Sequence, residues 1–185
     1  MAENIKLRSG STWKHLTPIR GVGFPNGVIS APVGTEYIDE NSTNGAQKWI
    51  KSSGTGNTGW VVSVGDTGWR DLTSLFSADI AVVNSNDYGV LVRRTNSEVK
   101  FNIKAQTSTT WAGQTTPIPQ GFRQGNKPVT LREALQTGGS GRGQLQFAAS
   151  LYFVSSTMAV GSRFAFDTVY SATDPWPTTL PGGSA

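Results

Sequence analysis

The chain has 185 residues, of which 22 are glycine, 9 are proline and 15% are charged; this composition disfavours a helical protein and favours a turn-rich all-β one. Its net charge of +4 is mild and scattered, whereas nucleic-acid-binding proteins concentrate basic residues on one face, so we expect no nucleic-acid partner. With no cysteine, the chain has no disulfide framework, thiol nucleophile or thiolate metal site.

The amino-terminal residues 1–27 predict a short β-prone arm that ends in the turn-rich GVGFPNG. An arm of this kind often docks on a neighbouring molecule. The opening MAENIKLRSG is charged and lacks the apolar stretch of a secretory signal. No apolar run approaches the roughly 18 residues of a membrane span, so we expect cytoplasmic synthesis and no membrane insertion.

Residues 28–73 predict a small module of β-hairpins, because short β-prone runs alternate there with segments rich in Gly, Asn, Ser and Asp. The expected strands are 35–39, 47–51, 60–64 and 69–73. The glycines of GTGNTG match the GxGxxG pattern of dinucleotide-binding loops. Such a loop must open a helix, whereas WVVSV follows here, so we expect a hairpin loop.

Residues 74–185 predict longer strands with a period of two. Val99, Phe101 and Ile103 form an apolar row in SEVKFNIKA, and one long alternating strand is expected at 144–154 and another at 163–171. Further strands are expected at 79–83, 88–94 and 129–135, although the last also carries the stripe of a short helix. Six strands suffice for an antiparallel β-sandwich or jelly-roll-like domain, with its boundary near Thr73.

Candidate catalytic residues are sparse. The single histidine, His15, lies in the arm without a cysteine partner, and no nucleophile motif surrounds a serine. Asp39 and Glu40 are adjacent, so on a strand they point to opposite faces. Asp66 and Asp71 lie beside turns, where aspartate bonds to the local backbone. We therefore expect no enzymatic activity, no cofactor and no metal.

Six short motifs carry a resemblance to a known family. GTEYID, TNGAQKWIK, SGTGNTGW and GDTGW follow one another between Gly34 and Leu72, and IPQGFR and DPWPTTLPG come later, at 118–123 and 174–182. Together they resemble minor tail, tail-fibre and baseplate proteins of tailed bacteriophages. The resemblance implies a virion component, homotrimeric, near the part of the tail that meets the host, assembled in the host cytoplasm with other phage structural proteins.

Within this interpretation, the chain is a tail-tip or fibre protein that attaches the virion to a bacterial cell-surface glycan through several weak sites at once. For a phosphate-bearing glycopolymer, the candidate ligand-binding residues are Trp111, Arg123, Arg142 and Arg163. Tryptophans bury large areas in small modules and at interfaces. We expect the tryptophans of the hairpin module either to pack against one another or to pack across a symmetry axis. The candidates for an oligomer interface are Trp49, Trp60, Trp69 and Trp176.

Two other functions match the same sequence features. The first is a capsid head fibre or decoration protein, in which the arm binds a capsid vertex and the β domain projects. The second is a stand-alone carbohydrate-binding module, or lectin, of bacterial origin, which would be monomeric and bind glycans without a phage particle.

Overall fold

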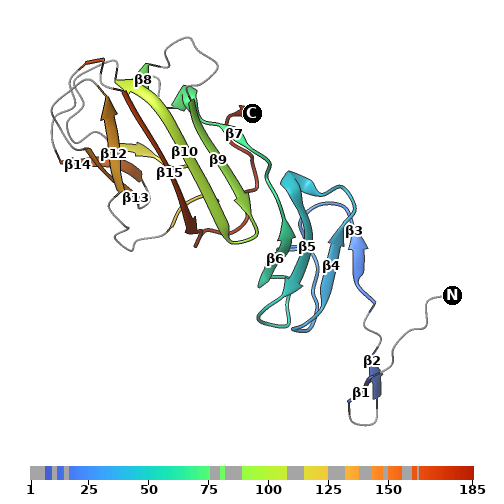
Figure 1. Ribbon diagram of the computed structural model, residues 1–185. Coiled ribbons are helices and arrows are strands. Elements are labelled where there is room, and N and C mark those ends of the chain that lie inside the picture. The colour runs from blue at the N-terminus through green and yellow to red at the C-terminus, as the bar shows by residue number, and fades with distance from the viewer. Residues whose placement is uncertain are drawn as a thin grey trace. The chain divides into compact units, whose positions relative to one another are not determined.

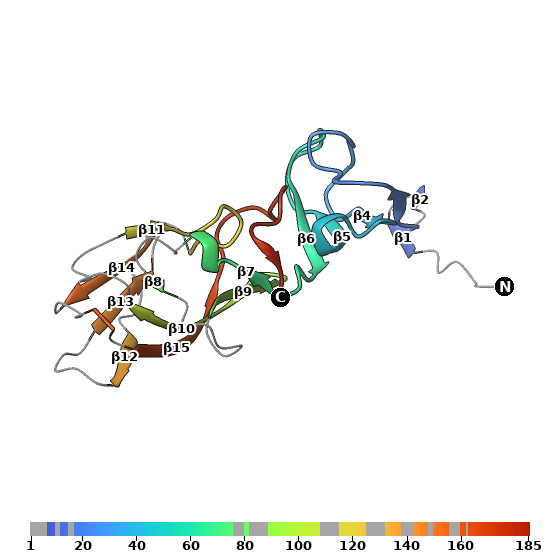
Figure 2. The same cartoon turned by 90° about the horizontal axis from the view of Figure 1, so that it is seen from above.

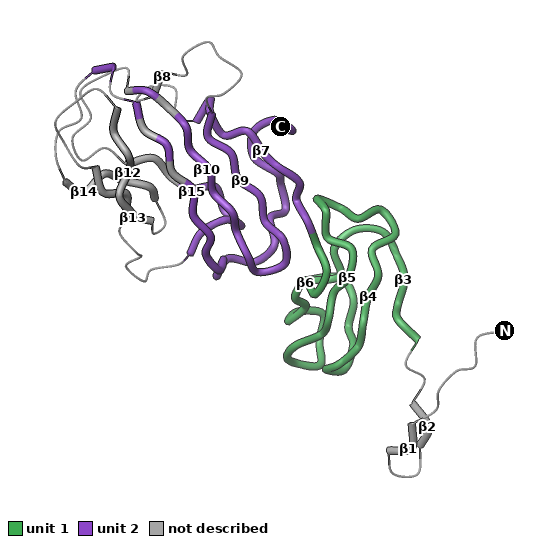
Figure 3. Tube along the Cα trace, viewed as in Figure 1, with its two compact units in different colours: residues 1–65 green, residues 66–185 purple. Residues whose placement is uncertain are grey.

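The computed structural model describes residues 7–9, 12–14, 17–75, 80–81, 89–107, 115–124, 132–137, 143–147, 150–155, 160–161 and 163–185. The fold is all-β, as predicted, and the described ranges contain strands and two short 3₁₀ turns, Thr43–Gly45 and Thr73–Leu75, but no α-helix (Figure 1). The chain divides into two compact units, residues 1–65 and 66–185 (Figure 3).

Unit 1 contains two sheets. A two-stranded antiparallel sheet pairs β1 (Leu7–Ser9) with β2 (Thr12–Lys14). A four-stranded sheet has the order β3-β4-β5-β6. Its strands are β3 (Ile19–Gly21), β4 (Glu36–Asp39), β5 (Ala46–Lys51) and β6 (Trp60–Gly65). Neighbouring strands are antiparallel except β3 and β4, which are parallel, so this sheet is mixed rather than made of hairpins alone.

One face of the four-stranded sheet is buried beneath the connection between β3 and β4, residues 22–35. Tyr37, Trp49 and Trp60 lie on this face, at exposures of 5% or less. The Phe24 ring lies 5.0 Å from that of Trp49, and the Trp60 indole N–H donates to the Ile29 carbonyl at 2.8 Å. Residues 19–29, which the sequence divided between arm and module, therefore belong to the packed part of unit 1.

The GTGNTG segment joins two antiparallel strands and opens no helix, as expected from the strand that follows it. Lys51 and Trp60 are cross-strand partners at its base. Gly59 has φ +86°, and a Cβ there would lie 2.3 Å from the Ser53 carbonyl oxygen, so a side chain would force the loop to shift. The loop geometry explains this glycine without a nucleotide.

Unit 2 forms one sheet in the order β11-β14-β13-β12-β15-β10-β9-β7-β16, and β8 also pairs with β10. The strands are β7 (Arg70–Asp71), β8 (Ile80–Ala81), β9 (Gly89–Thr95), β10 (Glu98–Thr107), β11 (Thr115–Pro117), β12 (Arg132–Thr137), β13 (Gly143–Phe147), β14 (Ser150–Ser155), β15 (Arg163–Ser171) and β16 (Gly183–Ser184). All these pairings are antiparallel, and the arrangement is consistent with a β-sandwich.

The centre of unit 2 is formed by β9, β10 and β15, which lie side by side in Figures 1 and 2. Val99, Phe101 and Ile103 of β10 are at most 1% exposed, which confirms the apolar row predicted there. The cross-strand partners of Phe101 and Ile103 on β9 are Val92 and Val90, both fully buried. This alternation places one face of β9 and β10 in the core.

Two expectations differ from the structure in detail. The run 144–154 is not one strand, because β13 and β14 pair antiparallel with Phe147 opposite Leu151. The alternation of apolar and polar residues runs through both strands, and no Gly, Pro, Asn or Asp between them signals a turn. The sequence therefore predicts one continuous strand. The expected boundary near Thr73 also falls later than the division at residue 65, because β7 pairs with β9 and so belongs to unit 2.

Candidate functional site

A buried arginine holds the start of the carboxyl-terminal segment of unit 2. Arg94 lies on β9 and is only 6% exposed. Its Nη1 donates to the carbonyl oxygens of Gly121, of Asp174 at 3.1 Å and of Pro175 at 2.9 Å. Its Cζ lies 5.1 Å from the centroid of the Trp176 ring, a cation–π distance. Burial lowers the pKa of the guanidinium from its usual value, partly offset by the charge of Asp174.

The segments 118–123 and 173–177 also bind each other. The Gly121 N–H donates to the Asp174 carboxylate at 2.8 Å, and the Thr173 N–H donates to the Arg123 carbonyl at 3.0 Å. Gly121 has φ +91°, and a Cβ there would lie 2.6 Å from Cβ of Pro177. The two segments are therefore in direct contact at a point that only glycine allows.

A tyrosine fixes this assembly to the sheet. Tyr170, at the end of β15, is 8% exposed and donates its hydroxyl to the Phe122 carbonyl at 2.7 Å. Burial raises the pKa of the Tyr170 hydroxyl, with a further contribution from Asp174, so the group stays a neutral donor. The motifs IPQGFR and DPWPTTLPG, far apart in sequence, thus form one anchored structure.

A pocket of about 510 Å³ lies between these two segments, and we call it the proline-lined pocket. Its apolar walls come from Pro119, Pro175, Trp176, Pro177 and Pro181. Its polar lining consists of Gln120, Thr178 and Thr179. A concave, mostly apolar surface with a few polar groups on a rigid support is typical of a small-ligand site.

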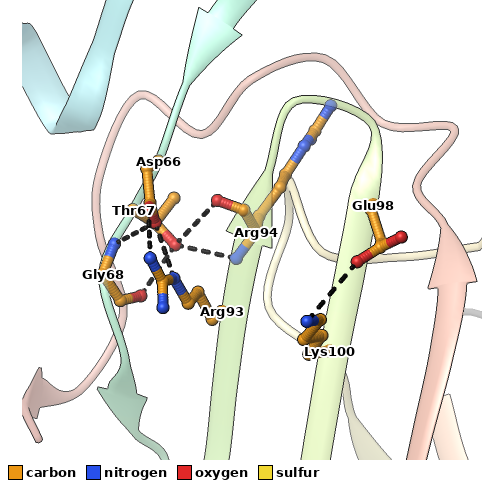
Figure 4. Close-up of polar contacts among 7 residues, drawn as sticks. All are labelled: Asp66, Thr67, Gly68, Arg93, Arg94, Glu98 and Lys100. Carbon is orange, nitrogen blue, oxygen red and sulfur yellow. Dashed lines mark hydrogen bonds and ion pairs between the residues drawn. The ribbon is translucent and has the colours of Figure 1, made fainter.

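The GDTGW motif attaches the start of unit 2 to β9 (Figure 4). Asp66 accepts hydrogen bonds from the Arg93 guanidinium, at 2.9 Å for Nε, and from the Gly68 N–H at 2.9 Å. The Arg93 hydrogen bonds lower the pKa of Asp66, against the effect of burial. The Thr67 hydroxyl accepts from the Arg94 N–H at 2.9 Å. Figure 4 shows the side chains of Arg93 and Arg94 pointing away from each other, as alternation on a strand requires.

Unit 1 has a second, more polar pocket of about 440 Å³ beside β3 and β4. Asp39 lines it, but this carboxylate accepts from the backbone N–H groups of Gly23, Asn41 and Thr43 at 2.8–3.0 Å. Burial alone would raise the pKa of Asp39, yet hydrogen bonds from Thr43, Gly23 and Asn41 outweigh it and lower the pKa. Asp39 therefore organises the turn after β4 and has little capacity left for a ligand.

The expected local roles of two other aspartates are confirmed. Asp66 accepts from Gly68 two residues later, and Asp71 accepts from the Thr73 N–H at 2.8 Å. These are the aspartate turns that the sequence predicted. Glu40 forms an exposed ion pair with Arg20, at 3.7 Å.

Of the four predicted ligand-binding residues, the structure describes two, Arg123 and Arg163, and it places them apart. Trp111 and Arg142 lie outside the described residues, as does His15. Arg163 is exposed at the start of β15, whereas Arg123 contacts Thr173, beyond the other end of that strand. A strand of this length spans roughly 30 Å, so Arg123 and Arg163 are too far apart to bind one small ligand.

The tryptophans predicted at an oligomer interface are mostly buried within a single chain. Trp49, Trp60 and Trp176 are 4–5% exposed, and Trp69 is half-buried. Trp60 packs edge-on to Tyr37 at 6.1 Å, Trp49 packs on Phe24, and Trp176 packs on Arg94. Their burial needs no partner subunit, and their role in an interface stays a prediction.

Sequence reasoning missed Arg94 and the residues that line the proline-lined pocket. The sequence did contain a sign that Arg94 is unusual. It follows Val90 and Val92 at the buried positions of β9, so the alternation places a charged side chain in the core. The pocket had no comparable signal, since it depends on contact between segments more than 50 residues apart in sequence.

No protein-family model, curated protein or solved structure matches this chain. Within the described residues, no cluster of three or more His, Cys, Asp or Glu side chains is placed to hold a metal ion. The same residues contain no helix that is long and apolar enough to cross a membrane.

Proposed function

We propose that this protein is a non-enzymatic virion component of a tailed bacteriophage that attaches the particle to a glycan on the bacterial surface. The resemblance of six motifs to phage tail proteins suggests the setting. The observation that carries the binding role is the proline-lined pocket, which combines apolar rings with amide and hydroxyl groups on a support fixed by Arg94 and Tyr170.

In this proposal the protein forms a homotrimer at the tail tip or fibre, together with other phage structural proteins. A single pocket of this size contacts only one or two sugar rings, so each site binds weakly. Three sites on one body raise the effective concentration of the ligand and give useful avidity without tight individual binding.

The first test is location. Antibodies against the chain should label purified particles produced from the genome that encodes it, and electron microscopy should place the label at the tail tip. Label on the capsid would instead favour a head fibre or decoration protein. Particles that lack the chain altogether would overturn the virion proposal and favour a stand-alone lectin.

The second test is attachment. The purified chain, with a native mass near three times 19.7 kDa by light scattering, should bind host cells and compete with phage adsorption. Substitution of Gln120 and Thr179 together by alanine should reduce cell binding at least about tenfold, because avidity multiplies the loss at each of three sites. Alanine at the exposed Lys48 of unit 1 serves as the matched control and should leave binding unchanged.

A further inference from the structure

We infer that the proline-lined pocket takes an uncharged saccharide rather than a phosphate-bearing glycopolymer, an inference that rests on the proposed attachment function. None of the described residues that line it is ionisable. Its polar lining residues are one glutamine and two threonines, and the others are four prolines and Trp176.

Charged side chains that bond to the segments around the pocket hold those segments in place. The Arg94 guanidinium is buried and donates to backbone carbonyls of both segments. Arg123 donates Nε to the Ile118 carbonyl at 2.8 Å and lies 4.0 Å from the Asp174 carboxylate. That carboxylate in turn accepts from Gly121. Arg70 acts in the same way, because it donates Nε to the Pro181 carbonyl at 3.0 Å and Nη2 to the Gly182 carbonyl at 2.8 Å. These hydrogen bonds hold the segments that form the pocket.

An anionic ligand would therefore lose hydration in this pocket without gaining a counter-charge. Removal of an ionised group from water is costly unless a partner of opposite charge replaces the lost solvent, whereas a hydroxyl needs only a hydrogen bond. A neutral sugar meets that condition, because the Gln120 amide and the Thr179 hydroxyl each both donate and accept.

The apolar lining matches the same ligand. Trp176 is only 5% exposed and lies against Arg94, and four of the five apolar lining residues are prolines. Their C–H surfaces suit the C–H face of a sugar ring, whose rim of hydroxyls then meets Gln120 and Thr179. A proline-rich peptide would also pack on such rings, but its proline residues have no N–H and would leave the acceptor atoms of Gln120 and Thr179 unused.

Opposite charges placed at Gln120 test the inference. This side chain is exposed, so Gln120→Glu and Gln120→Lys should both fold, with thermal midpoints close to that of the parent. Two charges about 5 Å apart near a protein surface interact strongly enough to change a dissociation constant by roughly fourfold or more in each direction. An anionic ligand should thus separate the two variants by at least about tenfold, whereas a neutral ligand should bind both within about threefold.

The probes are neutral mono- and oligosaccharides, a glycerol-phosphate polymer and a proline-rich peptide, titrated into the full chain by calorimetry and saturation-transfer NMR at 50 and 300 mM salt. Saturable binding of a neutral sugar, insensitive to salt and reduced by Thr179→Ala, would support the inference. Binding of the phosphate polymer that is weakened by glutamate and strengthened by lysine would overturn it and leave the attachment function intact.

Two further outcomes are decisive. Binding of the peptide in place of every saccharide would overturn both the inference and the glycan part of the proposed function. Binding of host cells by the full chain, with no response to any neutral sugar and no effect of Gln120 or Thr179 substitution, would overturn the assignment of the pocket while the attachment function stands.

Discussion

Among the residues that the structure describes, each unit has one buried cation beside a tryptophan, and the two cations differ in how far along the chain their hydrogen-bond acceptors lie. In unit 1, Lys51 is fully buried, its Nζ donates to the carbonyls of Gly56 and Thr58, and it lies 5.9 Å from the Trp60 ring centroid. In unit 2, Arg94 donates to carbonyls and lies over Trp176 in a similar way. Neither cation has a carboxylate as its hydrogen-bond partner in the described contacts.

The difference lies in sequence separation. The acceptors of Lys51 are five and seven residues away, so its ammonium orders one loop, GTGNTG. The acceptors of the Arg94 Nη1 atom are 27, 80 and 81 residues away, so its guanidinium joins two distant segments. A planar, multidentate donor suits the second task, whereas a compact ammonium suits the first. Lys51, whose acceptors are close in sequence, thus orders one loop, whereas Arg94, whose acceptors are distant, holds together the two segments that form the proline-lined pocket.

The largest effect is expected from Arg94→Met. Methionine keeps much of the apolar volume but leaves the carbonyls of Gly121, Asp174 and Pro175 without their donor, which should cost roughly 3–5 kcal/mol of unfolding free energy. Urea unfolding of the purified variant measures this loss. The tail segment should also lose its position, so binding at the proline-lined pocket should disappear together with stability.

Arg93→Met is the matched control, because it changes the same residue type one position earlier on β9. Its side chain is 38% exposed and contacts Asp66 rather than the tail. Equal losses from Arg93→Met and Arg94→Met would show that Arg94 does not anchor the carboxyl-terminal segment.

Lys51→Met should have the next largest effect. The substitution removes the donor to Gly56 and Thr58 and the contact with Trp60, and we expect a loss of about 2–3 kcal/mol, confined to unit 1. Calorimetry that resolves two transitions would locate the loss. Lys48→Met, at an exposed position of the same strand, should stay within about 0.5 kcal/mol of the parent. A downward shift of the unit 2 transition by Lys51→Met would contradict the local role.

Asp39→Asn tests the buried anion of unit 1, with an expected loss of about 1.5–3 kcal/mol at neutral pH, typical of hydrogen bonds to a charged group. Because the folded-state pKa of Asp39 is lowered, its contribution is complete above its unfolded value of about 3.9 and disappears as pH falls through the lower folded value. Urea titrations from pH 7 to pH 2 should therefore show the difference between parent and variant shrinking below about pH 4. A difference independent of pH would contradict the stabilised carboxylate, and Glu40→Gln provides the exposed control.

The sequence predicts local features of both units and few of the long-range ones. The strands 47–51, 60–64 and 163–171 follow from alternation and turn residues, and the aspartate turns follow from the chemistry of Asp66 and Asp71. Those signals depend on neighbours a few residues away. The parallel pairing of β3 with β4 and the β13–β14 reversal depend on partners that no local pattern specifies.

The candidate site shows the same limit. Aromatic and arginine residues in expected loops were reasonable candidates for binding a ligand. Residue type alone, however, does not predict which loops are in contact in the folded chain. The pocket forms because Gly121 can approach Pro177 and because Arg94 reaches both segments. One local sign of this contact was present in the sequence. Arg94 follows Val90 and Val92 on the inward side of β9, and a buried arginine there needs hydrogen-bond acceptors from elsewhere in the chain.

The smallest loss of unfolding free energy is expected from the Asp66–Arg93 pair. This exposed ion pair differs from the buried Arg94, whose hydrogen-bond partners are backbone carbonyls. Both side chains are almost two-fifths exposed, so water screens their attraction, and Asp66→Asn should cost at most about 1 kcal/mol. The loss should diminish further at 1 M salt, because exposed charges are screened within about 3 Å there, whereas the loss for Arg94→Met should persist because its partners are neutral carbonyls. Urea unfolding at 0.05 and 1 M NaCl measures both. If Arg94→Met proved as salt-sensitive as Asp66→Asn, the buried guanidinium would act as an ion-pair partner of Asp174 rather than as a donor to the backbone.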